Sequence, residues 1–428
     1  MLIDKPTIFI TVALTLITIV VPRKYFLAPF VLAACFVPTD QRFIIWDMDF
    51  TVLRILIAVG VMRILLYGEI SRVDWNRLVR LILLWAICGT FIYIIQWMNS
   101  EALVNRLGFL FDILGLYWIF RQRIRSWEDV KFVTALLAVS AIILLPLVIF
   151  ELISGHNPFT VLGRVMTGFR YERYRCQAAF PHSIMLGLFW ATLVPLFVGL
   201  GITEDKKMLY FNAAAASILI VIATSSSTPL LVLAGILMAL ILFKWRRFAP
   251  VVSLIILVSI AVLHIVMNAP VWHLLARINV IGGSTGWHRY NLINQALKHF
   301  DEWFLLGCRG TEHWGFGLGD VTNQFILEGV RGGLLTLLIF LAMIYLALKT
   351  LLNLSLKCRD NSEQCLTWCI FTALIGHCTA FLGVAYFGQI TMLWYMMLAT
   401  VSLLVEYKIH LEKTVPNVMP VNLSYSFK

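Results

Sequence analysis

The sequence predicts an all-α, polytopic membrane protein of about 12–13 transmembrane helices. Of its 428 residues, 60% are hydrophobic and only 13% are charged. Many of its apolar runs approach the roughly 20 residues that a helix needs to cross a bilayer. Helices are the expected crossing segments, because backbone groups without hydrogen bonds are too costly in lipid. We therefore expect one integral membrane domain over residues 1–428.

Turns and charges divide the apolar runs into separate elements. The first run is followed by Pro22-Arg23-Lys24 rather than by a small-residue cleavage site, so we interpret it as a span and not as a signal peptide. The first two runs are short, and they form either two spans or one broken element. The predicted spans are 7–21, 26–38, 49–67, 80–98, 103–120, 132–152, 182–201, 209–224, 228–243, 249–268, 333–349, 366–383 and 388–406.

Lysine and arginine are distributed unequally between the connections. Successive connections between spans lie on alternate sides of the membrane. If the connection with Arg23 and Lys24 is cytoplasmic, 20 of the 34 basic residues lie on that side and two lie in the short opposite loops. Cytoplasmic loops carry such an excess of positive charge. The long loops 153–181 and 269–332 then face the periplasm of a bacterial inner membrane. The basic loops on the cytoplasmic face explain the net charge of +11, and no basic tail indicates nucleic-acid binding.

An arginine cluster lies in the first long loop. The segment "GFRYERYRCQAAFPHS" carries Arg170, Arg173 and Arg175 just before an apolar run. The planar guanidinium group binds phosphate through two parallel hydrogen bonds and keeps its charge at any relevant pH. The cluster therefore predicts a site for a phosphorylated lipid headgroup or an anionic polymer. The alternative is a solvated loop that contacts ordinary phospholipid.

The second long loop combines an amphipathic helix with a glycine-rich segment. "WHRYNLINQALKHF" has helical periodicity, and we expect its helix to lie on the outer leaflet or to cap the bundle. "GCRGTEHWGFGLGD" follows, with five glycines that allow close backbone approach to a ligand. The predicted apolar face comprises Leu292, Ile293, Ala296, Leu297 and Phe300, and the predicted interfacial anchors are Trp303 and Phe304.

Four segments together resemble the O-antigen ligase and O-antigen polymerase family. The first is "RCQAAFPHSIMLG", and the others are "HRYNLINQAL", "WFLLGC" and "NQFILEGVRGG", in that order. The resemblance covers residues 170–350, and outside this range only the topology agrees. It implies a glycosyltransferase of the C-type membrane architecture that needs neither a metal nor another cofactor.

The resemblance also implies the substrates and the binding residues. Such enzymes move glycan from an undecaprenyl-pyrophosphate carrier to a glycan or lipid acceptor on the periplasmic side. Arg175 and Arg289 match the two arginines that hold the pyrophosphate, with Arg173 as a helper. Fixed cations of this kind stabilise the charge that develops on the leaving group. His182 and Asn323 are further expected substrate contacts.

One position departs from the family pattern. The family has a histidine, thought to activate the acceptor hydroxyl, immediately before the asparagine, whereas this chain has Thr322 there. Threonine cannot act as a general base near neutral pH. Asp320, His313 or positioning without a base are the alternatives. Polymerases and ligases share this architecture, and the missing histidine favours an exopolysaccharide polymerase.

Two other classes of function compete with glycan transfer. A transporter or flippase of lipid-linked glycans predicts inverted repeats, and the sequence has no clear repeat. A non-catalytic partner in envelope assembly is favoured only by the missing histidine.

Four charged residues in or near the first outside loop have two interpretations each. Asp47 and Asp49 in "WDMDF" could share a divalent cation, but an ion pair between one of them and Arg54 is simpler. Arg54 and Arg63 fall within a span, where a charge needs a structural partner or a polar groove.

Two cysteines lie beside the proposed phosphate-binding segments. Cys176 and Cys308 could form a disulfide between the two long loops in an oxidising compartment. The sequence leaves this bond and a pair of free thiols as alternatives.

Overall fold

The predicted all-α membrane fold is confirmed. The computed structural model describes residues 4–45, 48–163, 165–277, 286–358 and 360–414, which are mostly helical. Eight helical segments within these ranges are long and apolar enough to cross a membrane. The helices of the bundle are α1 (Lys5–Val20), α2 (Ala28–Phe36), α3 (Val52–Leu66), α4 (Arg77–Trp97), α5 (Ser100–Arg123), α6 (Trp127–Ser154), α7 (Ser183–Thr203), α8 (Lys207–Ala223), α9 (Ser227–Ile241), α10 (Ala249–Val266), α14 (Gln324–Lys357), α15 (Asn361–Phe381) and α16 (Ile390–Thr414).

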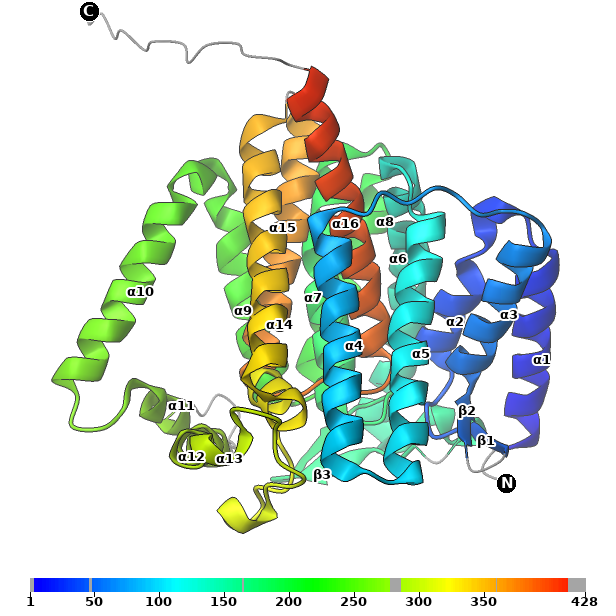
Figure 1. Ribbon diagram of the computed structural model, residues 1–428. Coiled ribbons are helices and arrows are strands. Elements are labelled where there is room, and N and C mark those ends of the chain that lie inside the picture. The colour runs from blue at the N-terminus through cyan, green and yellow to red at the C-terminus, as the bar shows by residue number, and fades with distance from the viewer. Residues whose placement is uncertain (1–3, 46–47, 164, 278–285, 359, 415–428) are drawn as a thin grey trace, which may run out of the picture.

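Each predicted span overlaps one of these helices, and the first two spans are separate helices. Successive helices run in alternating directions, so the connections fall at two ends of the bundle (Figure 1). One end carries two antiparallel hairpins, and we call it the hairpin end. The hairpins consist of β1 (Arg42–Ile45) with β2 (Met48–Thr51), and of β3 (Gly168–Arg170) with β4 (Arg173–Arg175).

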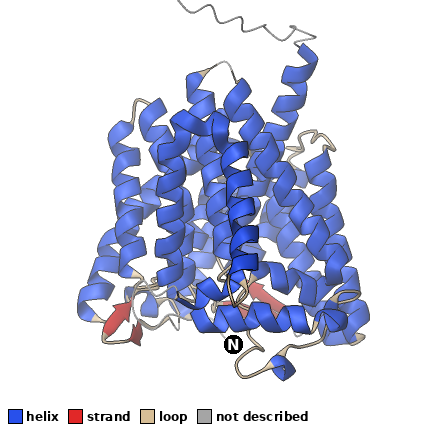
Figure 2. Cartoon of the chain, turned by 90° about the vertical axis from the view of Figure 1, so that its left-hand side faces the viewer, coloured by secondary structure: helices blue, strands red, loops and turns tan. Residues whose placement is uncertain are grey.

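Both long loops lie at the hairpin end, as the predicted alternation requires. The second loop contains α11 (Leu274–Arg277), α12 (Gly286–Lys298) and α13 (Phe300–Trp303). Helix α12 is seen end-on in Figure 1 and lies across the end of the bundle in Figure 2. It therefore caps the helices instead of continuing them.

Helix α7 forms the centre of the bundle, and nearly all of its residues are buried. It packs against α8, α9 and α15. Since its N-terminus lies at the hairpin end, the rigid core of the protein supports the segments there. Helix α10 is the opposite case, because none of its residues is buried and it is splayed away from the other helices of the bundle (Figure 1). Its sequence is apolar all round, which suits contact with lipid.

Helix α14 bends where the glycine pair occurs. Gly333 has φ +68°, and a Cβ atom there would lie 2.3 Å from the carbonyl oxygen of Leu305. Glycine is the residue that adopts this backbone conformation without a steric penalty. The bend brings the segment after α13 against α14, where the Leu334 N–H donates to the Phe304 carbonyl at 2.8 Å.

The arginines inside the bundle have structural partners. Arg54 donates to both carboxylate oxygens of Asp112, at 2.8 and 2.7 Å, while Asp49 pairs with Arg42 at 2.6 Å. The predicted ion pair of Arg54 with Asp49 is thus wrong, because α5 supplies a better-aligned carboxylate; Asp47 lies outside the described residues. Arg63 pairs with Glu69 at 3.5 Å. Both arginines thus have the structural partners that a charge within a span needs.

The predicted apolar face of the capping helix is only partly buried. Leu292 and Ala296 are buried, whereas Leu297 is 51% and Phe300 40% exposed. Trp303 was predicted as an interfacial anchor but is buried, and its indole N–H donates to the Ala296 carbonyl at 2.8 Å. Helix α12 is therefore held to the bundle through a narrow apolar stripe, Leu292 and Ala296, and through the Trp303 side chain.

The possible disulfide between the long loops is not formed. Cys176 and Cys308 are both free. Cys176 is buried with its thiol near the Val148 carbonyl, while Cys308 packs against the small core beneath α12. Burial raises the pKa of Cys176 to about 12 and that of Cys308 to about 11. Both thiols are therefore protonated and unreactive at neutral pH.

Candidate functional site

The arginine cluster folds as the β3–β4 hairpin. Tyr171 and Glu172 both have positive φ (51° and 58°), which is the tight turn that matches the twist of two antiparallel strands. Arg170 pairs with Arg173 in the register, and successive side chains of a strand alternate between faces. Arg170, Arg173 and Arg175 therefore share one face of the hairpin.

A buried carboxylate holds this hairpin to the bundle. Glu151, near the end of α6, is fully buried. It accepts hydrogen bonds from the backbone N–H groups of Gln177 at 3.0 Å and Ala178 at 2.9 Å. The Thr167 hydroxyl donates to it at 3.1 Å. The segments on both sides of the hairpin are thus fixed to one side chain, which sequence reasoning missed because an isolated acid in a span gives no sign of its partners.

The N-terminus of α9 receives both predicted pyrophosphate-binding arginines. Arg175 donates to the Ser226 hydroxyl at 2.8 Å, and Arg289 donates to the Thr228 hydroxyl at 2.7 Å. Arg289 also donates to the Gly383 carbonyl at 3.1 Å. Two arginines from different loops thus meet at one helix terminus, whose N–H groups favour anions. This terminus was not among the predicted site residues, although "SSSTP" is a helix-start signal.

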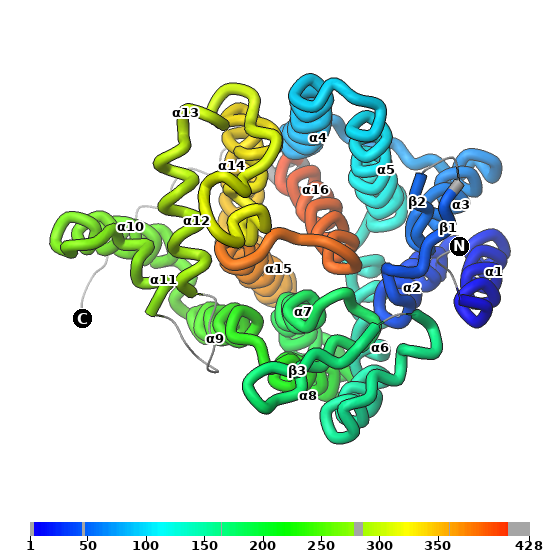
Figure 3. Tube along the Cα trace, turned by 90° about the horizontal axis from the view of Figure 1, so that it is seen from below, coloured from blue at the N-terminus to red at the C-terminus, as the bar shows by residue number. Residues whose placement is uncertain are grey.

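A cavity of about 350 Å³ opens among these groups. Figure 3 looks onto the hairpin end and shows the ends of α7 and α9 between β3 and α12. The structure therefore brings together residues that lie more than a hundred positions apart in the chain. The lining includes Arg170, Arg173, Arg175, His182, Ser225, Ser226, Ser227, Thr228, His288, Arg289, Asp320 and Thr322.

The cavity carries excess positive charge. Among the described residues, its four arginines form no ion pair, unlike Arg54 and Arg63 in the bundle. Burial and the neighbouring Arg170 lower the pKa of Arg175, and burial lowers the pKa of Arg289. The guanidinium groups nevertheless stay protonated. Partly buried cations without a counter-ion are an arrangement that an anionic ligand stabilises.

His182 adds a hydrogen-bond donor to the lining of the arginine cavity. Its Nδ1 accepts from the Ile184 N–H at 3.1 Å and caps α7. Burial, and then the charge of Arg175, lower the pKa of His182, although Asp320 opposes this. The imidazole is therefore neutral at pH 7 and carries its proton on Nε2, where it can donate to a ligand.

Asp320 and Thr322 come from the end of the glycine-rich loop. The Thr322 N–H donates to the Asp320 carbonyl at 3.0 Å. Asp320 is exposed to the cavity, and the Thr322 hydroxyl oxygen has no hydrogen-bond partner within the described part of the chain. Among the described residues, the lining of the arginine cavity thus includes the Asp320 carboxylate and the unpaired Thr322 hydroxyl.

Asn323 has a structural position instead of lining the cavity. Its side chain caps α14 by accepting from the Ile326 N–H at 3.1 Å, and it donates to the Leu382 carbonyl at 3.1 Å. Both ends of the amide are therefore occupied. Asn323 fixes the backbone next to Thr322, which is a positioning role.

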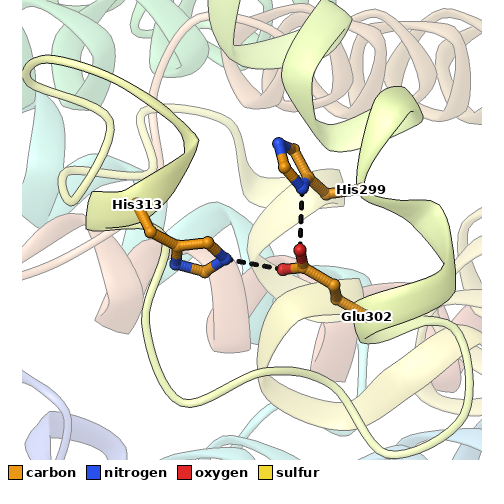
Figure 4. A group of neighbouring side chains, drawn as sticks. All are labelled: His299, Glu302 and His313. Carbon is orange, nitrogen blue, oxygen red and sulfur yellow. Dashed lines mark hydrogen bonds and ion pairs between the residues drawn. The ribbon is translucent and has the colours of Figure 1, made fainter.

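His313 does not line the cavity either. Its Nε2 lies 2.7 Å from a carboxylate oxygen of Glu302, which also faces His299 at 2.7 Å (Figure 4). Hydrogen bonds from Trp314 and the two histidines lower the pKa of Glu302 to about 2. Of the two bases that the sequence suggested, only Asp320 lies among the cavity arginines.

Replacing Glu151 with Ala should displace the hairpin. The change leaves the part-buried N–H of Gln177 and the buried N–H of Ala178 without this acceptor, and an unpaired buried group costs about 1–3 kcal/mol. If the cavity binds a lipid pyrophosphate, as the family resemblance implies, the affinity for the short analogue farnesyl pyrophosphate should fall by about tenfold or more. Cys176 should become accessible to a maleimide, as mapped by mass spectrometry. Glu128→Ala, at the exposed start of the same helix, serves as the control and should change neither.

Comparison with known proteins adds no relative. The chain matches no protein-family model and no curated protein.

Proposed function

We propose that the protein transfers glycan from an undecaprenyl-pyrophosphate carrier to a glycan or lipid acceptor. The observation that carries the proposal is the cavity in which Arg175 and Arg289 meet at the N-terminus of α9, with no ion pair to an acid in the described parts of the chain. A pyrophosphate supplies two adjacent negative groups, so it can contact both arginines and the helix terminus together. This arrangement supports the family resemblance of residues 170–350.

The proposed reaction uses the groups around the cavity in distinct roles. Asp320 accepts the proton of the acceptor hydroxyl, whose oxygen attacks the anomeric carbon of the donor sugar. The bond between that carbon and the pyrophosphate oxygen breaks, and polyprenyl pyrophosphate leaves with the electron pair. Arg175, Arg289 and the α9 terminus stabilise the charge on this leaving group. The Nε2–H of His182 donates to the same phosphates.

The charge distribution supports an extracytoplasmic site in a bacterial inner membrane. Twenty of the 34 lysines and arginines belong to the connections and tail assigned to the opposite end from the hairpins. Membrane proteins retain such residues in the cytoplasm. We therefore infer that the hairpin end faces the periplasm, where a lipid-linked glycan presents its pyrophosphate at the membrane surface.

A binding experiment with the purified full chain in nanodiscs tests the anion specificity. We expect farnesyl pyrophosphate to bind more tightly than farnesyl phosphate and farnesol, because only the pyrophosphate reaches both arginines. Inorganic pyrophosphate should compete, and high salt should weaken binding. Equal affinity for farnesyl pyrophosphate and farnesol would contradict the proposal.

A deletion strain of the source bacterium tests the reaction. For a polymerase, surface glycans resolved by size should lose long chains but keep single repeats. For a ligase, long chains should accumulate on the carrier lipid. The threonine in place of the family histidine supports an exopolysaccharide polymerase. Unchanged glycans, or repeat units trapped on the cytoplasmic leaflet as expected of a flippase, would contradict transfer.

A further inference from the structure

Three potential metal ligands converge on the surface of the hairpin end. His299 follows α12, Glu302 lies in α13, and His313 lies in the short turn Glu312–Trp314. The Nδ1 of His299 and the Nε2 of His313 each lie 2.7 Å from a different oxygen of Glu302 (Figure 4). The three ligand atoms are all within 4.8 Å of one another. The group is separate from the arginine cavity.

The ligand types select one class of ion. Two imidazoles and a carboxylate are a donor set that binds zinc, with one position left for water. Imidazole ligands favour zinc, copper and nickel, whereas calcium and magnesium prefer oxygen ligands alone. We propose that His299, Glu302 and His313 bind a divalent transition-metal ion of the zinc class.

The surroundings prepare the ligands and leave them accessible. The indole N–H of Trp314 donates to Glu302 at 3.0 Å, and its ring stacks on His299 with centroids 5.5 Å apart. Such neighbours orient metal ligands. The His313 side chain is 56% exposed, so an ion can enter from solvent. No lysine or arginine forms an ion pair with Glu302 among the described residues, so no cation occupies the place of the metal.

The ion would connect two segments that each contribute to the cavity. His299 and Glu302 follow the helix that carries Arg289, and His313 precedes Asp320 in the glycine-rich loop. The five glycines of that loop make its ordering entropically costly. A bound ion offsets part of that cost by fixing His313 to α13. The site therefore has a bracing role and takes no part in the transfer reaction.

Zinc titration of the purified, chelator-treated full chain in nanodiscs tests the site. We expect saturable binding of one Zn²⁺, and cobalt in its place should give the visible spectrum of a four-coordinate ion. His299→Ala and His313→Ala should each weaken binding more than about tenfold, because even outer-shell partners contribute about 10–100-fold. His156→Ala is the matched control, since His156 is an exposed histidine of the same end outside the cluster.

Hydrogen exchange supplies an independent readout. Zinc should slow exchange in the 309–323 segment of the wild-type chain and of His156→Ala, and should not slow it in His313→Ala. Binding of equal affinity in the wild type and the His299→Ala/His313→Ala double variant would overturn the site, as would a lack of saturable binding at millimolar zinc. These outcomes do not depend on the transfer assay, so they stand whether or not the proposed function is correct.

Discussion

Arg175→Ala and Arg289→Ala should each reduce glycan transfer by about 100–1,000-fold, which is the loss seen when one fixed donor to a developing negative charge is removed. Each side chain is anchored at the α9 terminus, through Ser226 and Thr228. Alanine removes one of the two anchored cations, and the other anchored arginine cannot take its place because it is held on its own hydroxyl. Transfer is measured with lipid-linked glycan isolated from the deletion strain.

Binding of farnesyl pyrophosphate separates this effect from a loss of folding. A hydrogen bond to a charged group contributes about 1.5–3 kcal/mol, so each alanine should weaken binding about 10–150-fold. Arg175→Lys and Arg289→Lys should bind farnesyl pyrophosphate with an affinity between those of the wild type and the alanine variants, since lysine keeps the charge but loses the planar guanidinium fork. Arg309→Ala is the control, because Arg309 is exposed at the same end and donates to the Gln96 carbonyl away from the cavity. Full transfer in both alanine variants would contradict the proposed site.

The helices and the loop placement could be predicted because they depend on local sequence. Apolar runs of the length of a bilayer give the spans, and the alternating direction of successive spans puts both long loops at one end of the bundle. The unequal distribution of basic residues predicts which side of the membrane that end faces. The arginines of the first loop were found because their charge is conspicuous outside the spans. Arg289 was found through its place at the start of an amphipathic helix, which the resemblance matched. The structure places Arg175 and Arg289 at one cavity.

The remaining parts of the site depend on contacts between distant segments. "SSSTP" reads as an ordinary helix start, and nothing in it shows that two arginines from other loops bond to Ser226 and Thr228. Arg54 had nearby carboxylates in sequence, yet its partner Asp112 comes from another helix. His313 was a reasonable base by type and loop, but it lies with Glu302 outside the cavity lining. In these cases the residue type indicated the chemistry of each side chain, but the sequence did not show which residue it contacts.

Asp320→Asn should reduce the rate of transfer by about 100–10,000-fold, the usual contribution of a positioned general base. The amide keeps the size and the hydrogen-bonding capacity of the side chain but cannot accept the hydroxyl proton. Because the change removes a negative charge beside the arginines, farnesyl pyrophosphate should bind as tightly as before or more tightly. A loss of rate together with retained binding identifies a role in chemistry, whereas a misfolded site would lose both.

His313→Ala is the matched comparison for Asp320→Asn, since the sequence suggested both residues as the base. The two variants are compared in chelator-treated buffer, so that metal at His313 contributes to neither. If Asp320 accepts the proton, His313→Ala should transfer at nearly the wild-type rate while Asp320→Asn does not. A large loss of rate in His313→Ala with a nearly wild-type rate in Asp320→Asn would place the base outside the arginine cavity. Equal, undiminished rates would mean that the acceptor hydroxyl is activated by position alone, with Thr322 as the neighbouring polar contact.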